Sequence, residues 1–241
     1  GEFIMIFAGI LAGGTGTRMN ITNMPKQFLM LGSKPIIIHT LEKFLLSSKL
    51  DYVYVGVHND WITYCKELID QYIKYGKEKV RVVEGGNDRN GTIMNIVSDI
   101  EKEFGESDNN IIVTHDAVRP FVTLKIIEKN IDAAIEYGAC DTVIPASDTI
   151  VESKDCCNIS EIPNRKYLYQ GQTPQSFRIG LIKKLYQELS DEEKNILTDA
   201  CKICVIKEQK VHLVEGDTLN IKITTINDYN IAKAILSEEE K

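Results

Sequence analysis

Residues 4–19 read IMIFAGILAGGTGTRM, an apolar run that leads directly into a glycine-rich stretch. The apolar part predicts a buried strand from Met5 to Leu11. Because glycine has no Cβ, backbone N–H groups in the following loop can approach phosphate oxygens closely. Arg18 and Lys26 add two positive charges to the same neighbourhood. The stretch therefore predicts a strand and loop that bind the phosphates of a nucleoside triphosphate.

The glycine pattern alone also fits a tight strand–helix turn with no ligand. Gly13, Gly14 and Gly16 do not keep the GxGxxG spacing of dinucleotide-binding loops, and the chain has no GK[ST] of a P-loop. A purely structural turn, however, does not need Arg18 and Lys26. The two charges therefore favour the phosphate site.

Strand-like and helix-like segments alternate along the rest of the chain. We expect further strands at 52–57, 80–84, 111–114 and 140–145, and helices at 36–47, about 60–75, 92–103 and 123–137. The strands are apolar throughout rather than half polar, which indicates a parallel sheet covered on both faces. The predicted fold is α/β, a Rossmann-like three-layer sandwich with a mostly parallel central sheet.

The rhythm changes between Ser147 and Gln172, where the sequence becomes polar. Strand-like pieces at Thr149–Ser153 and Lys166–Gln170 predict a protruding antiparallel β-arm at about 147–172. We expect one domain over residues 5–236 that includes this arm. Residues 1–4 precede Met5 and resemble an expression remnant.

Composition narrows the possible functions. The chain has 241 residues, 43% of them hydrophobic and 26% charged, as in globular proteins, and its net charge is −7. This charge argues against bulk attraction to nucleic acid or an anionic membrane surface. No apolar stretch approaches the roughly 18 residues of a membrane span, and no secretory signal is evident, so we expect a cytoplasmic protein. The spacing of Cys201 and Cys204 lacks a second CxxC, and we interpret the six cysteines as reduced.

Residues 115–120, HDAVRP, follow a predicted buried strand. A carboxylate there, Asp116, can hold Mg²⁺, which prefers oxygen ligands and bridges to substrate phosphates. Arg119 could bind a phosphate through two hydrogen bonds. The alternative is an ion pair that only holds the loop. We expect His115 to orient the loop rather than to bind metal.

Two further segments allow either a ligand or a structural role. Residues 85–92, GGNDRNGT, could read a base edge through backbone groups and the Thr92 hydroxyl, or could simply start an N-capped helix. Lys222 lies in a strand-like run at 221–224, where it either extends along a strand edge or points at an anion. We favour the anion.

Taken together, these segments resemble the cytidylyltransferases that activate sugar-alcohol phosphates. The resemblance covers residue 5 to about residue 236 and rests on seven ordered motifs: LAGGTGTRM, PKQF, GGNDRNGT, HDAVRP, NR…GQTPQ, LTDA and IKIT. One branch acts on 2-C-methyl-D-erythritol 4-phosphate and the other on D-ribitol 5-phosphate. The first usually has Thr-Asp-Glu where this chain has Thr198-Asp199-Ala200, so the chain is more similar to the ribitol branch, whose product serves teichoic-acid-type polymers.

The resemblance also implies roles for individual residues. The triphosphate would lie against Leu11, Ala12, Gly13, Gly14, Thr15, Gly16 and Thr17. Catalytic roles fall to Arg18, Lys26 and Lys222, and Mg²⁺ binding to Asp116. Gly86 and Thr92 would help to select cytosine, with Arg89 supporting their loop at the nucleotide. Substrate contacts fall to Arg119, Arg165, Thr173 and Thr198. The family often has serine at the position of Thr92, which makes cytosine selection less certain than phosphate binding.

In the implied reaction, a polyol phosphate attacks the α-phosphorus of CTP and pyrophosphate leaves. The arm would carry Arg165 into the site of a partner subunit, so the resemblance implies a homodimer. Two other functions remain open at this point. One is a nucleotidyltransferase for a hexose 1-phosphate or an aminosugar phosphate, against which HDAVRP and the TPQ segment argue. The other is a subunit that binds CTP without turnover.

Overall fold

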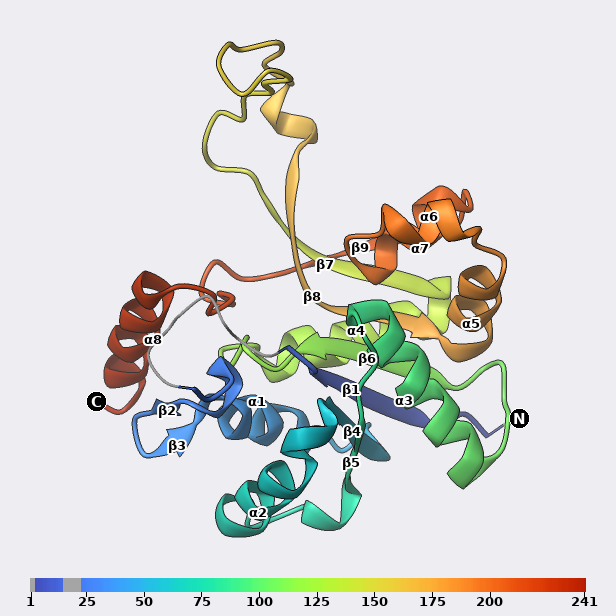
Figure 1. Cartoon of the computed structure of the whole chain (residues 1–241), viewed down its shortest axis with the longest axis vertical. Helices are drawn as coiled ribbons and strands as arrows, with labels where there is room; N and C mark the ends of the chain where they lie inside the picture. Colours follow the sequence, from blue (N-terminus) through green and yellow to red (C-terminus); the bar gives the residue numbers. More distant parts are fainter. Residues whose placement is uncertain (1–2, 15–22) are drawn as a thin grey trace.

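The structure is a computed structural model that describes residues 3–14 and 23–241. Its centre is a seven-stranded sheet in the order β5-β4-β1-β6-β8-β7-β9 (Figure 1). The strands are β1 (Ile6–Ala12), β4 (Tyr52–Val57), β5 (Val80–Glu84), β6 (Ile111–Asp116), β7 (Ala139–Pro145), β8 (Tyr169–Arg178) and β9 (His212–Glu215). A separate two-stranded sheet pairs β2 (Met30–Leu31) with β3 (Lys34–Pro35).

The direction of the strands confirms the predicted sheet. Strand β1 runs parallel to both β4 and β6, β4 runs parallel to β5, and β7 runs parallel to β9. Strand β8 alone is antiparallel to its neighbours β6 and β7 among the described strands of this sheet. The sheet is therefore mostly parallel, as the continuous apolar runs predict.

Helices from two groups cover the two faces of the sheet. The described helices are α1 (Ile36–Leu45), α2 (Ile62–Tyr72), α3 (Arg89–Phe104), α4 (Leu124–Tyr137), α5 (Ile179–Gln187), α6 (Asp191–Asn195), α7 (Ala200–Ile206) and α8 (Ile226–Glu239). Helices α1, α2 and α4 share one hydrophobic cluster with Ala8, whereas α3, α5 and α7 share another with Phe7. Successive strand residues point to opposite faces, so the sheet separates two cores. The three-layer prediction is confirmed.

Helix α3 starts earlier than the sequence pattern predicts. It begins at Arg89 rather than Thr92, because the Asp88 carboxylate caps it by accepting a hydrogen bond from the Gly91 N–H at 2.7 Å. An acidic N-cap satisfies a backbone donor that the first helical turn leaves unpaired. The apolar periodicity alone does not report such a cap.

The arm protrudes between β7 and β8, at the top of Figure 1, but it is not a regular β-hairpin. The predicted strand Thr149–Ser153 does not form, and one isolated antiparallel bridge joins Glu152 to Glu161. The predicted piece Lys166–Gln170 is split between a 3-10 turn at Arg165–Tyr167 and the start of β8. A polar two-stranded ribbon with no core to cover has little to stabilise it. The segment between the end of β7 and the start of β8 is 146–168, and we refer to it as the arm.

The strand-like reading of 221–224 is also wrong, because no strand forms there. Instead the backbone N–H of Ile223 donates to the Val118 carbonyl at 3.0 Å, and the Ile223 side chain is fully buried beside Leu31. This anchoring places Lys222 next to the loop after β6. Among the described residues, no helix has both the length and the apolar character that a membrane span requires.

Candidate active site

A cavity of about 390 Å³ opens beyond the carboxyl ends of β1, β5 and β6. The chain leaves β1 for β4 and β5 on one side and returns to β6 on the other, and ligands of open α/β sheets bind where the strand order reverses in this way. The described lining residues are Leu11, Ala12, Gly13, Gly14, Lys26, Gln27, Gly86, Asn87, Asp88, Arg89, Thr92, Asp116, Ala117, Val118 and Lys222. Residues from five separate segments thus meet at one site.

The start of the glycine loop is held by Gln27. Its buried amide nitrogen donates to the carbonyls of Ala12 at 2.9 Å and Gly14 at 3.0 Å. Gln27 follows Lys26 in a short 3-10 turn, so the same turn fixes the loop and places the lysine in the cavity lining. The predicted residues Thr15, Gly16, Thr17 and Arg18 lie outside the described residues.

The loop after β5 is closed by the side chain of Thr92. The Gly86 N–H donates to Thr92 Oγ1 at 3.0 Å, and that hydroxyl donates to the Asp88 carbonyl at 3.0 Å. A Cβ on Gly86 would lie 2.5 Å from the carbonyl carbon of Gly91, so this position requires glycine. The Thr92 hydroxyl is used within the loop, and its role in reading cytosine stays a prediction.

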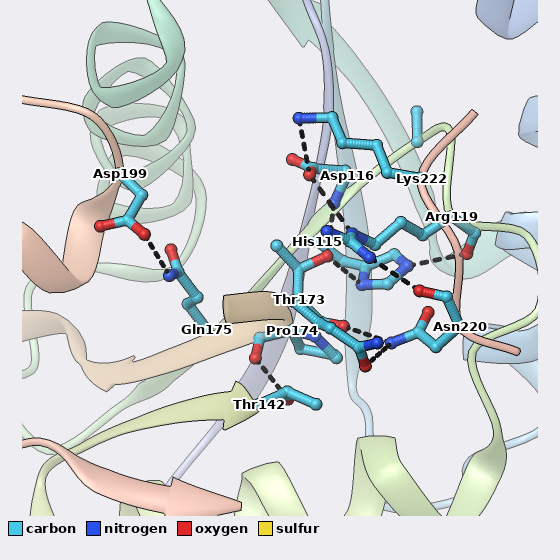
Figure 2. Close-up of polar contacts among 12 residues, drawn as sticks. His115, Asp116, Arg119, Thr142, Thr173, Pro174, Gln175, Asp199, Asn220 and Lys222 are labelled. Atoms are coloured by element: carbon cyan, nitrogen blue, oxygen red, sulfur yellow. Dashed lines mark hydrogen bonds and ion pairs between the residues drawn. The ribbon is translucent and has the colours of Figure 1, made fainter. Parts of the chain in front are cut away.

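Asp116 lies among three cationic side chains. Its Oδ1 is 3.3 Å from Arg89 Nε. Its Oδ2 is 3.3 Å from Lys222 Nζ and 3.7 Å from Arg119 Nε (Figure 2). Burial alone would raise the pKa of Asp116, but the positive charges of Arg89, Lys222 and Arg119 outweigh it and hold the pKa well below its usual range. The carboxylate is therefore ionised. Because three cationic side chains surround this one carboxylate, the group of four carries an excess of positive charge.

His115 orients the loop through both ring nitrogens. Its Nε2 lies 3.0 Å from the Arg119 carbonyl, which can only accept, so this nitrogen carries the proton. Its Nδ1 then accepts from Thr173 Oγ1 at 2.8 Å, and that oxygen accepts from the Asp116 N–H at 3.2 Å (Figure 2). Burial lowers the pKa of His115 to about 4, which agrees with a neutral ring.

Arg119 and Asn220 connect the Lys222 segment to the sheet. Arg119 Nη1 donates to the Asn220 carbonyl at 2.7 Å, and Asn220 Nδ2 donates to the Thr173 carbonyl at 2.9 Å (Figure 2). The fully buried Asn220 and the nearly buried Gln27 support the site, although the sequence predicts a role for neither. The position of Gln27 directly after Lys26 is the one sequence feature that could have indicated such a role.

Two predicted substrate contacts lie away from the cavity. Arg165 is on the exposed arm, where its Nη1 donates to the Ser147 carbonyl at 2.7 Å. Thr198 is exposed in the connection between α6 and α7. Neither is among the described lining residues; Arg119 and Thr173 are not in the lining either, but both contact Asp116, which is. Within one chain, the fold gathers the nucleotide-side residues but not this pair.

The arrangement suits a polyanionic ligand. The cavity lining contains the cationic side chains of Lys26, Arg89 and Lys222. The guanidinium of Arg119 lies behind them, 3.7 Å from the Asp116 carboxylate. The described residues hold no group of three or more His, Cys, Asp or Glu side chains placed to bind a metal ion. An ionised Asp116 is nevertheless one oxygen ligand of the kind Mg²⁺ takes when phosphates and water supply the others. The donor set therefore fits a metal that arrives with its nucleotide.

A Rossmann-like fold with a glycine loop and cations at this edge defines a nucleotidyltransferase. Residues 6–238 match the family described as 2-C-methyl-D-erythritol 4-phosphate cytidylyltransferase, and the chain belongs to that family. Over 235 residues it is 53% identical to the "Ribitol-5-phosphate cytidylyltransferase" of Streptococcus pneumoniae serotype 2. This match covers 98% of this chain and 100% of that relative. The chain is thus a cytidylyltransferase.

Solved structures agree on the fold. The 4-diphosphocytidyl-2C-methyl-D-erythritol synthase of Anaerococcus prevotii has a TM-score of 0.79 at 26% identity, covering 97% of this chain and 96% of that one. The 2-C-methyl-D-erythritol 4-phosphate cytidylyltransferase of Francisella tularensis has a TM-score of 0.77 at 24% identity, covering 95% and 99% respectively. The predicted fold and family are confirmed.

Proposed function

We propose that this chain transfers the cytidylyl group of CTP to D-ribitol 5-phosphate, giving CDP-ribitol and pyrophosphate. The observation that carries the choice of acceptor is the 53% identity, over the full length, to a relative named for ribitol 5-phosphate. By comparison, the two solved structures described above are named for methylerythritol compounds, and they are 26% and 24% identical to this chain. On this proposal the product supplies teichoic-acid-type polymers and the enzyme works in the cytoplasm.

In the proposed reaction, a phosphate oxygen of the acceptor attacks the α-phosphorus of CTP while the bond to pyrophosphate breaks. A phosphate monoester is largely ionised near neutral pH, so no strong base is required. The protein's part is to position the reactants and to stabilise charge. Lys26 and Arg18 would bind the triphosphate as its charge shifts, and Lys222 and Arg119 would lie at the acceptor phosphate.

Asp116 would hold Mg²⁺, which supplies charge stabilisation at the leaving pyrophosphate when it is bound. On phosphate binding, Arg89 and Lys222 can exchange the Asp116 carboxylate for phosphate oxygens, because both already lie 3.3 Å from it. Both cations also line the cavity that would hold the triphosphate. The ionised Asp116 would then be available to the metal.

We further propose that the active form is a homodimer in which the arm completes the partner's site. The support is that Arg165, which lies on the arm, does not line the cavity of its own chain. The arm also exposes apolar side chains, with Ile159 at 61% and Ile162 at 57%. A second copy is the surface to which these side chains would pack.

A pyrophosphate-release assay with CTP and Mg²⁺ tests the acceptor. We expect D-ribitol 5-phosphate to give a kcat/KM at least about tenfold above that of 2-C-methyl-D-erythritol 4-phosphate, a discrimination of about 1.4 kcal/mol. A higher value for the methylerythritol phosphate would assign the enzyme to the other branch. Release of no pyrophosphate with either acceptor would leave a CTP-binding subunit without turnover.

A further inference from the structure

Gln175 is a buried amide behind the cavity, and neither the motifs nor the proposed reaction gives it a role. It lies on β8, between Thr114 of β6 and Asp141 of β7 in the sheet register. Its side chain is only 1% exposed, so it cannot contact a substrate directly. Any influence on the reaction must pass through its neighbours.

The hydrogen bonds of Gln175 fix the orientation of its amide. Its Oε1 accepts from Arg89 Nη1 at 3.3 Å, whereas its Nε2 donates to Asp199 Oδ2 at 3.0 Å and to Asp141 Oδ1 at 3.2 Å. A guanidinium can only donate, so the amide oxygen must face Arg89. Both N–H groups then face the two acids, and the reverse orientation would lose the bond to the cation.

These bonds connect two segments that the proposed reaction uses. On one side, Arg89 begins α3 and pairs with Asp116 at 3.3 Å in the cavity. On the other side, Asp199 caps α7 by accepting from the Lys202 N–H at 3.0 Å, directly after Thr198 (Figure 2 shows the Gln175–Asp199 bond). One side chain thus determines how far the cavity cations lie from the α6–α7 connection.

We propose that Gln175 is a positioning residue, which holds Arg89 against Asp116 and holds Asp199 so that Thr198 faces the acceptor phosphate. This role rests on the proposed function. Common substitutions do not reproduce the pattern: glutamate has no amide N–H groups to donate to Asp141 and Asp199, and an apolar side chain would leave Arg89 and both acids without these partners.

The test uses Gln175→Met, which keeps the length of the side chain and removes its hydrogen bonds, and Gln175→Glu, which replaces the donor. Pyrophosphate release is measured while each substrate is varied, with thermal unfolding for every variant. We expect kcat/KM for the acceptor to fall about tenfold to a hundredfold, as for outer-shell partners of catalytic groups. The KM values for CTP and for the acceptor should both rise, because Gln175 contacts Arg89 in the cavity as well as Asp199 beside Thr198.

Ser176→Ala is the matched control. Ser176 is the next residue on β8, is fully buried, and donates to Asn130 Oδ1 at 2.9 Å on the face away from Gln175. Its loss should lower the unfolding temperature and leave both KM values unchanged. A second measurement combines Gln175→Met with Arg89→Lys, and we expect the two effects to be less than additive because they break one contact.

The outcomes separate the two hypotheses. If the wild type is active and Gln175→Met behaves like Ser176→Ala, or its effect simply adds to that of Arg89→Lys, the positioning role is wrong and the proposed function stands. If the wild type releases no pyrophosphate with either acceptor, the proposed function fails, and the role of Gln175 fails with it.

Discussion

The cavity and the arm are built in opposite ways. In the cavity, Asp116 is 7% exposed and Arg119 is 9% exposed, and each is held by partners from distant parts of the chain. In the arm, residues 146–168 contain one isolated β-bridge in place of a regular ladder, and Tyr167 is 71% exposed. This difference indicates that the described residues of one chain build the cavity by themselves. The arm, in contrast, lacks a surface to pack against within its own chain.

The largest effect should come from removing the central charge of the cavity. Asp116→Ala leaves Arg119 and Arg89 without their carboxylate, and breaking such a buried pair costs about 3–5 kcal/mol of unfolding free energy. Urea unfolding measures this loss, and activity should disappear as well. Asp132→Ala is the control, because Asp132 pairs with Lys49 on the surface and its loss should cost about 1 kcal/mol or less. Equal losses of unfolding free energy for the two variants would contradict this prediction, because the cavity pairs would then be no stronger than a surface pair.

The second prediction concerns turnover. Lys26→Ala should reduce kcat by about 10²–10³, because a preorganised positive charge acts mainly as the charge of the triphosphate shifts. Arg18→Ala should do the same, a prediction that rests on the sequence alone. Lys34→Ala is a suitable control, since its ammonium pairs with Glu42 at 2.9 Å near the surface, away from the cavity lining. Near-normal kcat for Lys26→Ala would contradict the assignment.

The third prediction contrasts a carboxylate behind the cavity with one on the arm. Burial, together with the charge of Asp199, raises the pKa of Asp141 to about 7, although the hydrogen bond from Gln175 opposes this. The folded protein then keeps a proton that the unfolded chain has lost, so this contribution is complete at low pH and disappears as pH rises through 7. Asp141→Asn removes it. Between pH 6 and pH 8, we expect the wild type to lose about 1–2 kcal/mol relative to Asp141→Asn.

His115 does not disturb this comparison. Its lowered pKa acts in the opposite direction, but chiefly below its usual value of 6.5, and both proteins share it. On the arm, hydrogen bonds from Asn158 and Cys157 lower the pKa of the exposed Asp155, so its titration falls at acid pH. Asp155→Asn should therefore track the wild type from pH 6 to pH 8 in unfolding experiments. A wild type that tracks Asp141→Asn over that range would show that Asp141 does not titrate there.

Sequence patterns predicted the sheet and its site edge because both depend on local features. Buried parallel strands are apolar runs, and the loops after them bring Lys26, Gly86 and Asp116 together by topology. The requirement for glycine at position 86, in contrast, is visible only in the structure, where backbone atoms of Gly91 and Thr92 crowd it. Of the cations around Asp116, only Arg119 belongs to the HDAVRP motif. Arg89 and Lys222 come from distant parts of the chain, and the motif gives no information about them.

What the sequence could not predict are contacts that join distant segments without a periodic pattern. The amide of Gln27 finds two carbonyls after β1, and Asn220 reaches the Thr173 carbonyl, and nothing in the local sequence marks either partner. The arm was predicted to contain strand-like pieces at Thr149–Ser153 and Lys166–Gln170, but pairing requires a buried face that a polar segment does not have. Tertiary packing, not propensity, decided these regions.

The last prediction asks whether the arm belongs to the partner's site. Arg165→Ala should raise the KM for the acceptor about tenfold, or about 1.4 kcal/mol, while the unfolding temperature stays unchanged because the residue is exposed. Lys166→Ala, the neighbouring exposed cation, should leave KM unaltered. Coexpressing Lys26→Ala with Arg165→Ala then gives mixed dimers in which one site has an intact cavity and an intact arm. Random pairing should restore about a quarter of the wild-type sites, measured as pyrophosphate release at low acceptor concentration. Activity that never exceeds the sum of the separate variants would mean that each arm serves only its own chain, and the cavity would then have to bind the acceptor without Arg165.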